Sequence, residues 1–138
     1  MEVILLVCAQ SAVIDQQTNA LSIFNILQEL SSPSFPFAIG GFTVSTIFSR
    51  ENTEIEDPTD VRLKIHLQGK QIGDFELVLK FQGRTGLRHV GNFQGLLLTE
   101  PGNLIFSVHQ GEREMGHWTV LVQHIGTPVM NAENSLAE

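Results

Sequence analysis

The stretch of sequence that decides the fold is VRLKIHLQGKQIGDFELVLKF, residues 61–81. Every second residue is apolar from Val61 to Leu67, and again from Phe75 to Phe81. This period of two is typical of a strand with one buried and one solvent-facing side. The residues between the halves, Gly69-Lys70-Gln71, are typical of a hairpin turn. The stretch is therefore predicted to be a pair of antiparallel strands.

Turn signals recur along the rest of the chain and separate further apolar segments. Counting outward from residues 61–81, this spacing predicts about eight strands and is typical of a sandwich or barrel. The predicted strands are 2–13, 20–30, 37–49, 61–68, 72–82, 87–98, 104–110 and 114–125. We expect an all-β fold, a two-sheet antiparallel β-sandwich of the immunoglobulin-like (Ig-like) kind. A single domain should span residues 1–126, and residues 127–138 should form a flexible acidic C-terminal tail.

Residues 20–30, ALSIFNILQEL, are the one segment with a competing interpretation. The apolar side chains at Leu21, Phe24 and Leu27 also fit a helical stripe. The turn-forming residues from Asp15 to Asn19 favour a hairpin and hence a strand.

The register of the last two predicted strands follows from the length of the loop between them. A three-residue loop at Gly111-Glu112-Arg113 would place Gln110 opposite Glu114 and Phe106 opposite Trp118. Phe106 and Trp118 would then lie on the same buried face, together with Leu63, Ile65, Leu77 and Leu79 of the other strands.

The N-terminal strand is apolar on both faces from Val3 to Ala9 and is predicted to be covered on both sides. It resembles a signal sequence only in part, because Glu2 stands where a positive charge is expected. The sequence thus predicts a cytoplasmic protein without a targeting segment. Apolar residues on nominally outer faces predict a protein partner, most simply a homo-oligomer. These residues are Ile4, Leu6, Ile47, Val78 and Leu121.

Composition excludes several classes of function. The chain of 138 residues has 15 acidic residues against 8 Lys and Arg, a net charge of −7. A nucleic-acid-binding protein needs a basic face, and so does a protein that binds an anionic membrane surface. We therefore expect neither nucleic acid nor membrane as a partner. The single cysteine, Cys8, cannot form an internal disulfide, which suits a reducing compartment.

Two segments carry a resemblance to a family: Leu27 to Pro36 and Pro101 to Val122, the latter within GLLLTEPGNLIFSVHQGEREMGHWTVLV. They resemble an uncharacterised family of small bacterial and phage β-sandwich proteins. The sequence departs from that family at Leu104, where an aromatic Tyr is usual. The resemblance implies a β-sandwich and no particular chemistry.

Among candidate chemical groups, His109 and His117 come first. In the predicted register they are diagonal neighbours on an outer face, about 7–8 Å apart, with His117 opposite Ser107. Two imidazoles and the nearby Glu114 fall short of the ligand set of a zinc site, so they are expected to be solvated side chains. We therefore predict no bound metal and no cofactor, with His109 and His117 as the weak candidates.

Two further features have a chemical and a structural interpretation. Cys8 lies within the most apolar strand and is predicted to be a buried hydrophobe rather than a nucleophile. Acidic residues crowd the loop 51–60 and could bind calcium, but a Pro interrupts them and their spacing matches no EF-hand. These acids are Glu51, Glu54, Glu56, Asp57 and Asp60. A solvated loop is the favoured interpretation.

The sequence thus contains no recognised catalytic constellation. We expect a non-catalytic protein-binding or assembly module. The alternatives are a ligand- or carbohydrate-binding β-sandwich and a metal-dependent enzyme that uses surface histidines. Elemental analysis would separate the last of these from the others.

Overall fold

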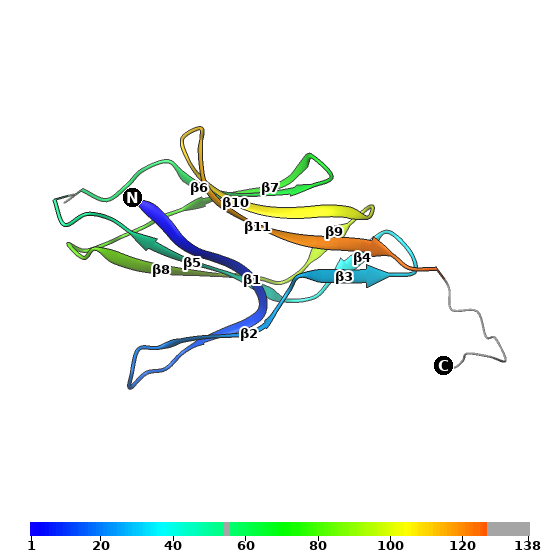
Figure 1. Ribbon diagram of the computed structural model, residues 1–138, viewed down its shortest axis with the longest axis horizontal. Helices are drawn as coiled ribbons and strands as arrows, with labels where there is room; N and C mark the ends of the chain where they lie inside the picture. Colours follow the sequence, from blue (N-terminus) through cyan, green and yellow to red (C-terminus); the bar gives the residue numbers. More distant parts are fainter. Residues whose placement is uncertain (54–55, 127–138) are drawn as a thin grey trace.

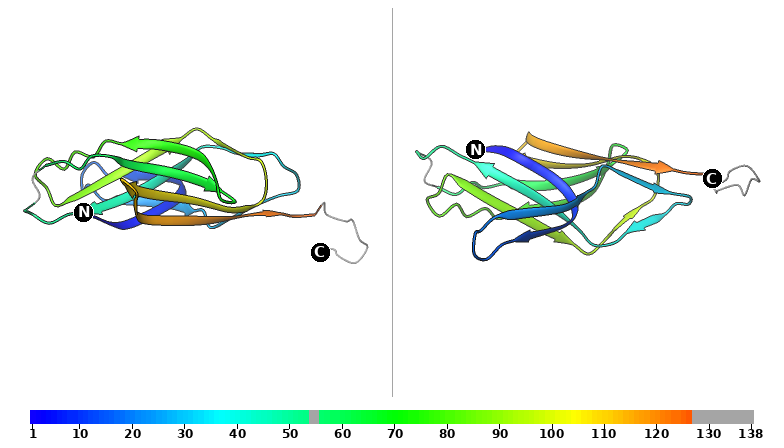
Figure 2. Two further views of the ribbon diagram at one scale, coloured as in Figure 1. Left: turned by 90° about the horizontal axis from the view of Figure 1, so that it is seen from above. Right: turned by 60° about the horizontal axis from the view of Figure 1, so that its bottom comes forward.

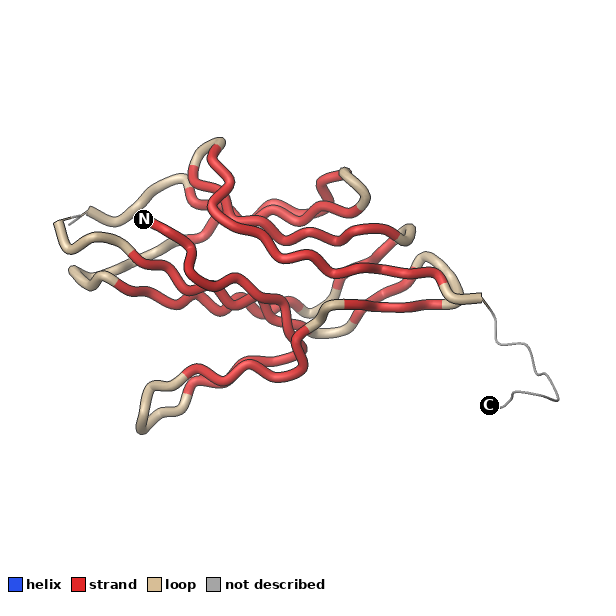
Figure 3. The backbone as a smooth tube through the Cα atoms, viewed as in Figure 1, coloured by secondary structure: helices blue, strands red, loops and turns tan. Residues whose placement is uncertain are grey.

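The computed structural model describes residues 1–53 and 56–126. The predicted acidic tail 127–138 and Glu54 lie outside the described residues. The described part of the chain consists of strands and loops without a helix (Figure 3). It therefore holds no helix of the length and apolarity needed to cross a membrane.

Eleven strands follow one another along the described residues. They are β1 Glu2–Ile14, β2 Leu21–Ile26, β3 Glu29–Ser32, β4 Phe37–Ile39, β5 Phe42–Ser49, β6 Val61–Leu67, β7 Lys70–Leu77, β8 Gly86–Phe93, β9 Leu96–Leu98, β10 Gly102–Gln110 and β11 Arg113–His124.

The strands form two larger sheets and one small one (Figure 1). The first, here called sheet A, has the order β2-β1-β5-β8, and the second, sheet B, has the order β3-β11-β10-β6-β7. The small sheet pairs β4 with β9 at one end of the molecule (Figure 2). The all-β prediction is confirmed.

One strand pair contradicts the expectation of purely antiparallel sheets: β3 runs parallel to β11. The cause is a crossing of the chain between the sheets. The N–H of Leu27 donates to the carbonyl of Cys8 in sheet A, at 2.8 Å. The carbonyl of the next residue, Gln28, accepts from Leu121 in sheet B, also at 2.8 Å. The chain therefore enters sheet B alongside β11 without reversing.

The count of eight strands is wrong because three predicted segments each form two strands. Residues 20–30 break at this crossing, and their helical interpretation is wrong. Residues 37–49 break at Gly40-Gly41, and residues 87–98 break at Gln94-Gly95. A Cβ on Gly95 would lie only 3.0 Å from the carbonyl oxygen of Ile39, so the two broken segments approach closely there.

Sheets A and B contribute to a single hydrophobic core. Its largest fully buried side chains include Phe48 from β5, Phe106 from β10 and Ile65 from β6. Five of the six core residues predicted from the sequence are buried; they are Leu63, Ile65, Leu77, Leu79 and Phe106. Trp118 is only half-buried, because its indole N–H reaches the carbonyl of Leu27, at 2.8 Å, on the segment that crosses between the sheets.

Both predicted three-residue hairpin loops are in fact two-residue turns. Gln68 and Gly69 have φ angles of 51° and 84°, and positive values at both positions are the mark of a type I′ turn. At the other hairpin Gln110 pairs with Arg113, so its predicted pairing with Glu114 is wrong. A bulge beyond Val108 restores the register, and the pairing of Phe106 with Trp118 is confirmed.

A bulge between Val3 and Leu5 also changes the alternation of β1. Leu6, expected on an outer face, is consequently buried in the core. Ile47 is half-buried. The other predicted outer residues are exposed, with Ile4 at 62%, Val78 at 69% and Leu121 at 38%.

The far half of β1 leaves β5 and pairs with β2, forming a hairpin that projects from the body of the molecule (Figure 1). Its turn is held to sheet A by Arg88 of β8. The Arg88 guanidinium donates to the backbone carbonyl and to the side-chain oxygen of Asn19, each at 2.7 Å.

Candidate functional site

The two histidines singled out from the sequence have separate polar partners. Nε2 of His109 lies 3.0 Å from Oγ of Ser107, and Nδ1 of His117 lies 3.3 Å from Oε2 of Glu114. Burial, and next the nearby Lys64, lower the pKa of His109. Among residues 1–53 and 56–126, no three His, Cys, Asp or Glu side chains are grouped so as to hold a metal ion. The structure thus adds no third ligand to these histidines.

Cys8 is 1% exposed in the core, as predicted. Burial raises the pKa of its thiol to about 12. Because the thiolate is the reactive form, this thiol is inert at neutral pH.

The acidic loop is tied to the body of the protein by contacts that use its backbone and one carboxylate. Oδ1 of Asp57 accepts the backbone N–H of Phe81, at 2.9 Å. The carbonyl of Glu56 accepts from Nη1 of Arg50, at 2.7 Å, and the guanidinium carbon of Arg50 lies 4.2 Å from the centre of the Phe81 ring. Through these contacts, Asp57 and the buried Arg50 anchor the loop to the body of the protein.

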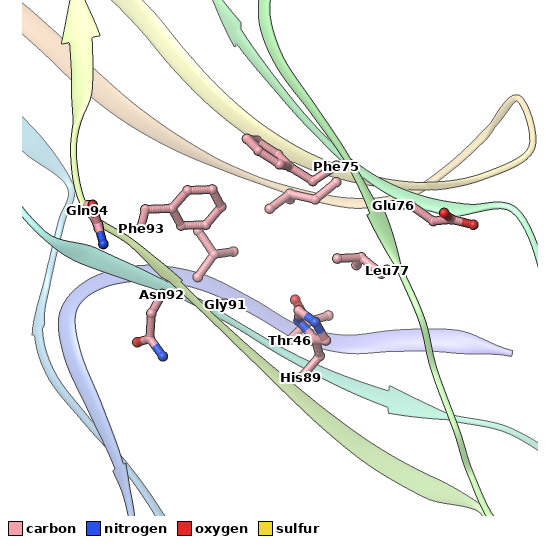
Figure 4. Close-up of a pocket in the computed structure, with 11 residues that line it drawn as sticks. Thr46, Phe75, Glu76, Leu77, His89, Gly91, Asn92, Phe93 and Gln94 are labelled. Atoms are coloured by element: carbon pink, nitrogen blue, oxygen red, sulfur yellow. The ribbon is translucent and has the colours of Figure 1, made fainter.

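A pocket of about 330 Å³ lies between β7 and β8 and reaches core residues such as Val44 and Leu63. These strands end sheets B and A, respectively, so the pocket opens at an edge of the molecule where neither sheet continues (Figure 4). Its lining residues come from β5 to β8 and the residue after β8; they are Val44, Thr46, Leu63, Phe75, Glu76, Leu77, His89, Gly91, Asn92, Phe93 and Gln94. We call it the edge pocket.

A chain of phenylalanine rings leads from the edge pocket into the core. The ring of Phe75 meets Phe93 edge-on, with centroids 5.3 Å apart, and Phe93 stacks on Phe42 at 4.9 Å. Phe42 in turn meets the fully buried Phe106 at 5.8 Å. Phe75 itself is 44% exposed although it faces inward, because no strand lies beyond β7 in its sheet. One end of the hydrophobic core is therefore accessible from solvent at the edge pocket.

Gly91 makes room for the edge pocket. A Cβ at this position would meet only ordinary van der Waals neighbours, the nearest being Cε2 of Phe93 at 3.5 Å. Gly91 lies within the predicted strand 87–98 and within β8 of the structure, but nothing in the sequence connects it with Phe75 or Leu77. That connection depends on which strands end the two sheets.

Five of the eleven residues that line the edge pocket are polar: Thr46, Glu76, His89, Asn92 and Gln94. His89 pairs with Thr46 across β8 and β5, and both side chains lie below Leu77 in Figure 4. Burial lowers the pKa of His89, so its imidazole is neutral at pH 7. Figure 4 shows the Glu76 carboxylate directed away from Phe75. Apolar side chains such as Leu63, Phe75 and Leu77 lie beside these polar residues, so the edge pocket suits an apolar group that can also form hydrogen bonds.

Comparisons with known proteins add no family to this description. No protein-family model matches the sequence, and no curated protein matches it either.

Proposed function

We propose that the protein is a non-catalytic protein-binding module with an Ig-like β-sandwich fold, and that the edge pocket receives an apolar side chain of its partner. The observation that carries this proposal is the exposure of Phe75 and the open end of the core beside it. A shared core between sheets A and B supports the sandwich.

The expected energetics fit a single anchoring residue. Full burial of one Leu, Ile or Phe side chain stabilises a complex by about 1.5–3 kcal/mol. Binding energy in protein interfaces is commonly concentrated in a few such anchors seated in pockets. The edge pocket would provide the position of one of them.

The experiment fills the edge pocket with a larger side chain of the protein itself. Gly91→Val places two methyl groups in the edge pocket, and Thr119→Val places the same side chain on the exposed face of β11 as a control. Affinity purification from the source cell, read by quantitative mass spectrometry, compares the three proteins. We expect a partner that the wild type and Thr119→Val retain and Gly91→Val loses. Equal recovery by all three contradicts the proposed site.

The size of the edge pocket favours a second candidate, the binding of a small apolar molecule. About 330 Å³ is at the lower end of the range for small-ligand sites. Native mass spectrometry of the purified protein distinguishes this candidate, because a retained small molecule would add a discrete mass that Gly91→Val removes.

Self-association is a separate part of the proposal. It is supported by apolar side chains exposed on β1 and β2, among them Ile4, Val13, Phe24 and Ile26. Light scattering that gives the mass of one chain at micromolar concentration would contradict it.

A further inference from the structure

The two larger sheets end in four edge strands: β2, β3, β7 and β8. Edge strands are commonly protected against further pairing by shortness, bulges, Lys or Pro. β3 has only four residues, β7 begins with Lys70 and pairs with β6 through a bulge, and β2 contains Asn25 at a φ of 57°. β8 carries one charged residue, Arg88, but it has no Lys, Pro or bulge, and all eight of its residues pair with β5 in one unbroken register. β8 is therefore the least protected edge of the two sheets.

The direction of the backbone groups of β8 follows from one hydrogen bond. The N–H of Arg50 donates to the carbonyl of Thr85, at 2.8 Å, just beyond the paired strands. In antiparallel sheets, residues that bond to a given neighbour alternate with residues that do not. Leu87, His89 and Gly91 thus direct their backbone groups to β5. Arg88, Val90 and Asn92 direct theirs to the open side.

The side chains of β8 alternate as well. His89 and Gly91 face the edge pocket, and Arg88 and Val90 face the outer side of sheet A. In an added antiparallel strand, the residue opposite Gly91 would point into the edge pocket. The residue opposite Arg88 would come three positions later and lie on the outer side.

The positive charge of Arg88 indicates which type of residue the added strand should have opposite it. Arg88 is the one Lys, Arg, Asp or Glu in the β8 sequence GLRHVGNF. An acidic residue directly opposite Arg88 gives a favourable cross-strand pair. Arg88 already donates twice to Asn19, which holds its guanidinium at this face while leaving further N–H donors. The net charge of −7 matters little here, because salt screens charges beyond about 8 Å.

A second copy of this chain fits less well. β8 pairing with β8 of another copy brings no carboxylate opposite Arg88, because the strand contains no Asp or Glu. The favoured occupant is an extended segment of a different protein.

We propose that the partner adds an antiparallel strand to β8, with an apolar residue opposite Gly91 and an acidic residue three positions later opposite Arg88. This proposal rests on the proposed function and names the partner's chemistry at the same site. The backbone of the segment bonds to Arg88, Val90 and Asn92, and its apolar side chain enters the edge pocket.

Selection from a random 12-residue peptide library displayed on phage tests the proposal on the full chain. The enriched peptides should share apolar residues at alternate positions and an Asp or Glu three positions after one of them. Selection on Arg88→Glu should replace that acid with Lys or Arg. Circular dichroism and a thermal melt verify that each variant is folded.

Val90→Pro tests the backbone bonds separately, because it removes an N–H that faces the added strand and leaves the pairing with β5. Proline is tolerated at such edge positions. We expect the selected peptides to lose about fivefold in affinity on Val90→Pro, the cost of one hydrogen bond, and to bind Val90→Ala nearly as well as wild type.

The outcomes separate the two proposals. Strand addition is overturned if the selected peptides lack alternating apolar residues and bind Val90→Pro as well as wild type. The edge pocket remains the binding site in that case if Gly91→Val abolishes the binding of these peptides. A dimer that dissociates on Val90→Pro makes a second copy the occupant and overturns the heterologous partner. Absence of any enriched peptide contradicts strand addition, while the affinity purification with Gly91→Val still decides the proposed function.

Discussion

The ring of Phe75 on β7 stands edge-on to the ring of Phe93 on β8, with centroids 5.3 Å apart and planes inclined at 77°. This contact joins the free edges of sheets A and B across the edge pocket. One ring is 44% exposed, and its neighbour stacks on the core residue Phe42. The edge pocket and the core are thus parts of one packed aromatic chain.

Phe106 and Phe75, at the two ends of this series of contacting rings, should respond differently to truncation. Phe106→Ala removes a fully buried ring and should lower the free energy of unfolding by about 3–5 kcal/mol. Phe75→Ala should cost clearly less, because water already reaches much of that ring. Urea denaturation of both variants checks the order, and equal losses would show that the edge pocket is closed in solution.

His89 should make stability depend on pH. Burial lowers its pKa in the folded protein, so the unfolded chain takes up a proton first as the pH falls through the ordinary value near 6.5. The free energy of unfolding should therefore decrease between pH 6.5 and the lowered pKa of the folded state. His109 acts in the same direction.

The contribution of His89 is isolated by His89→Gln, which should flatten the decline measured by urea denaturation between pH 7.5 and pH 5. Thr119→Val, on the exposed outer side of β11, removes no titratable group and serves as the control, so it should leave the profile unchanged. An unchanged profile in His89→Gln would mean that His89 is hydrated in solution.

How much the sequence predicts depends on the range of the interactions. The strands β6, β7, β10 and β11 were predictable because alternation along residues 61–81 and around Phe106 is a local pattern, although the predicted strand 72–82 ends at Leu77 in the structure. The breaks at Gly40 and Gly95 were not, because they depend on the two segments approaching each other in space. The bulge that buries Leu6 shifts a register without changing the apolar pattern.

The candidate site could not be predicted from the sequence for a related reason. Nothing local distinguishes Phe75, which faces an open edge, from Phe81, which is buried. The difference arises from the strand order, in which β7 and β8 are last in their sheets. The histidines at 109 and 117, which the predicted register placed as diagonal neighbours, have no metal-binding arrangement around them in the described residues.

Cys8 should be slow to react in the native protein. It is 1% exposed, and burial raises its pKa to about 12, so very little thiolate exists at pH 8. Labelling with a bulky aromatic disulfide reagent should be complete within minutes in urea and should take hours without it. Rapid native labelling would place Cys8 outside the core.

Trp118 should stabilise the crossing between the sheets through a single hydrogen bond. Its Nε1–H donates to the carbonyl of Leu27, at 2.8 Å, one residue before Gln28 joins sheet B. Trp118→Phe keeps an aromatic ring of similar position and removes the donor, and it should lower the free energy of unfolding by about 0.5–1.5 kcal/mol. Hydrogen exchange should quicken at Leu27 and Leu121, whose N–H groups bond on either side of the crossing, and should stay unchanged at Arg50 at the far end of β5. A uniform increase at all three sites would assign the loss to global stability, and Trp118 would then have no special role in holding β3 to β11.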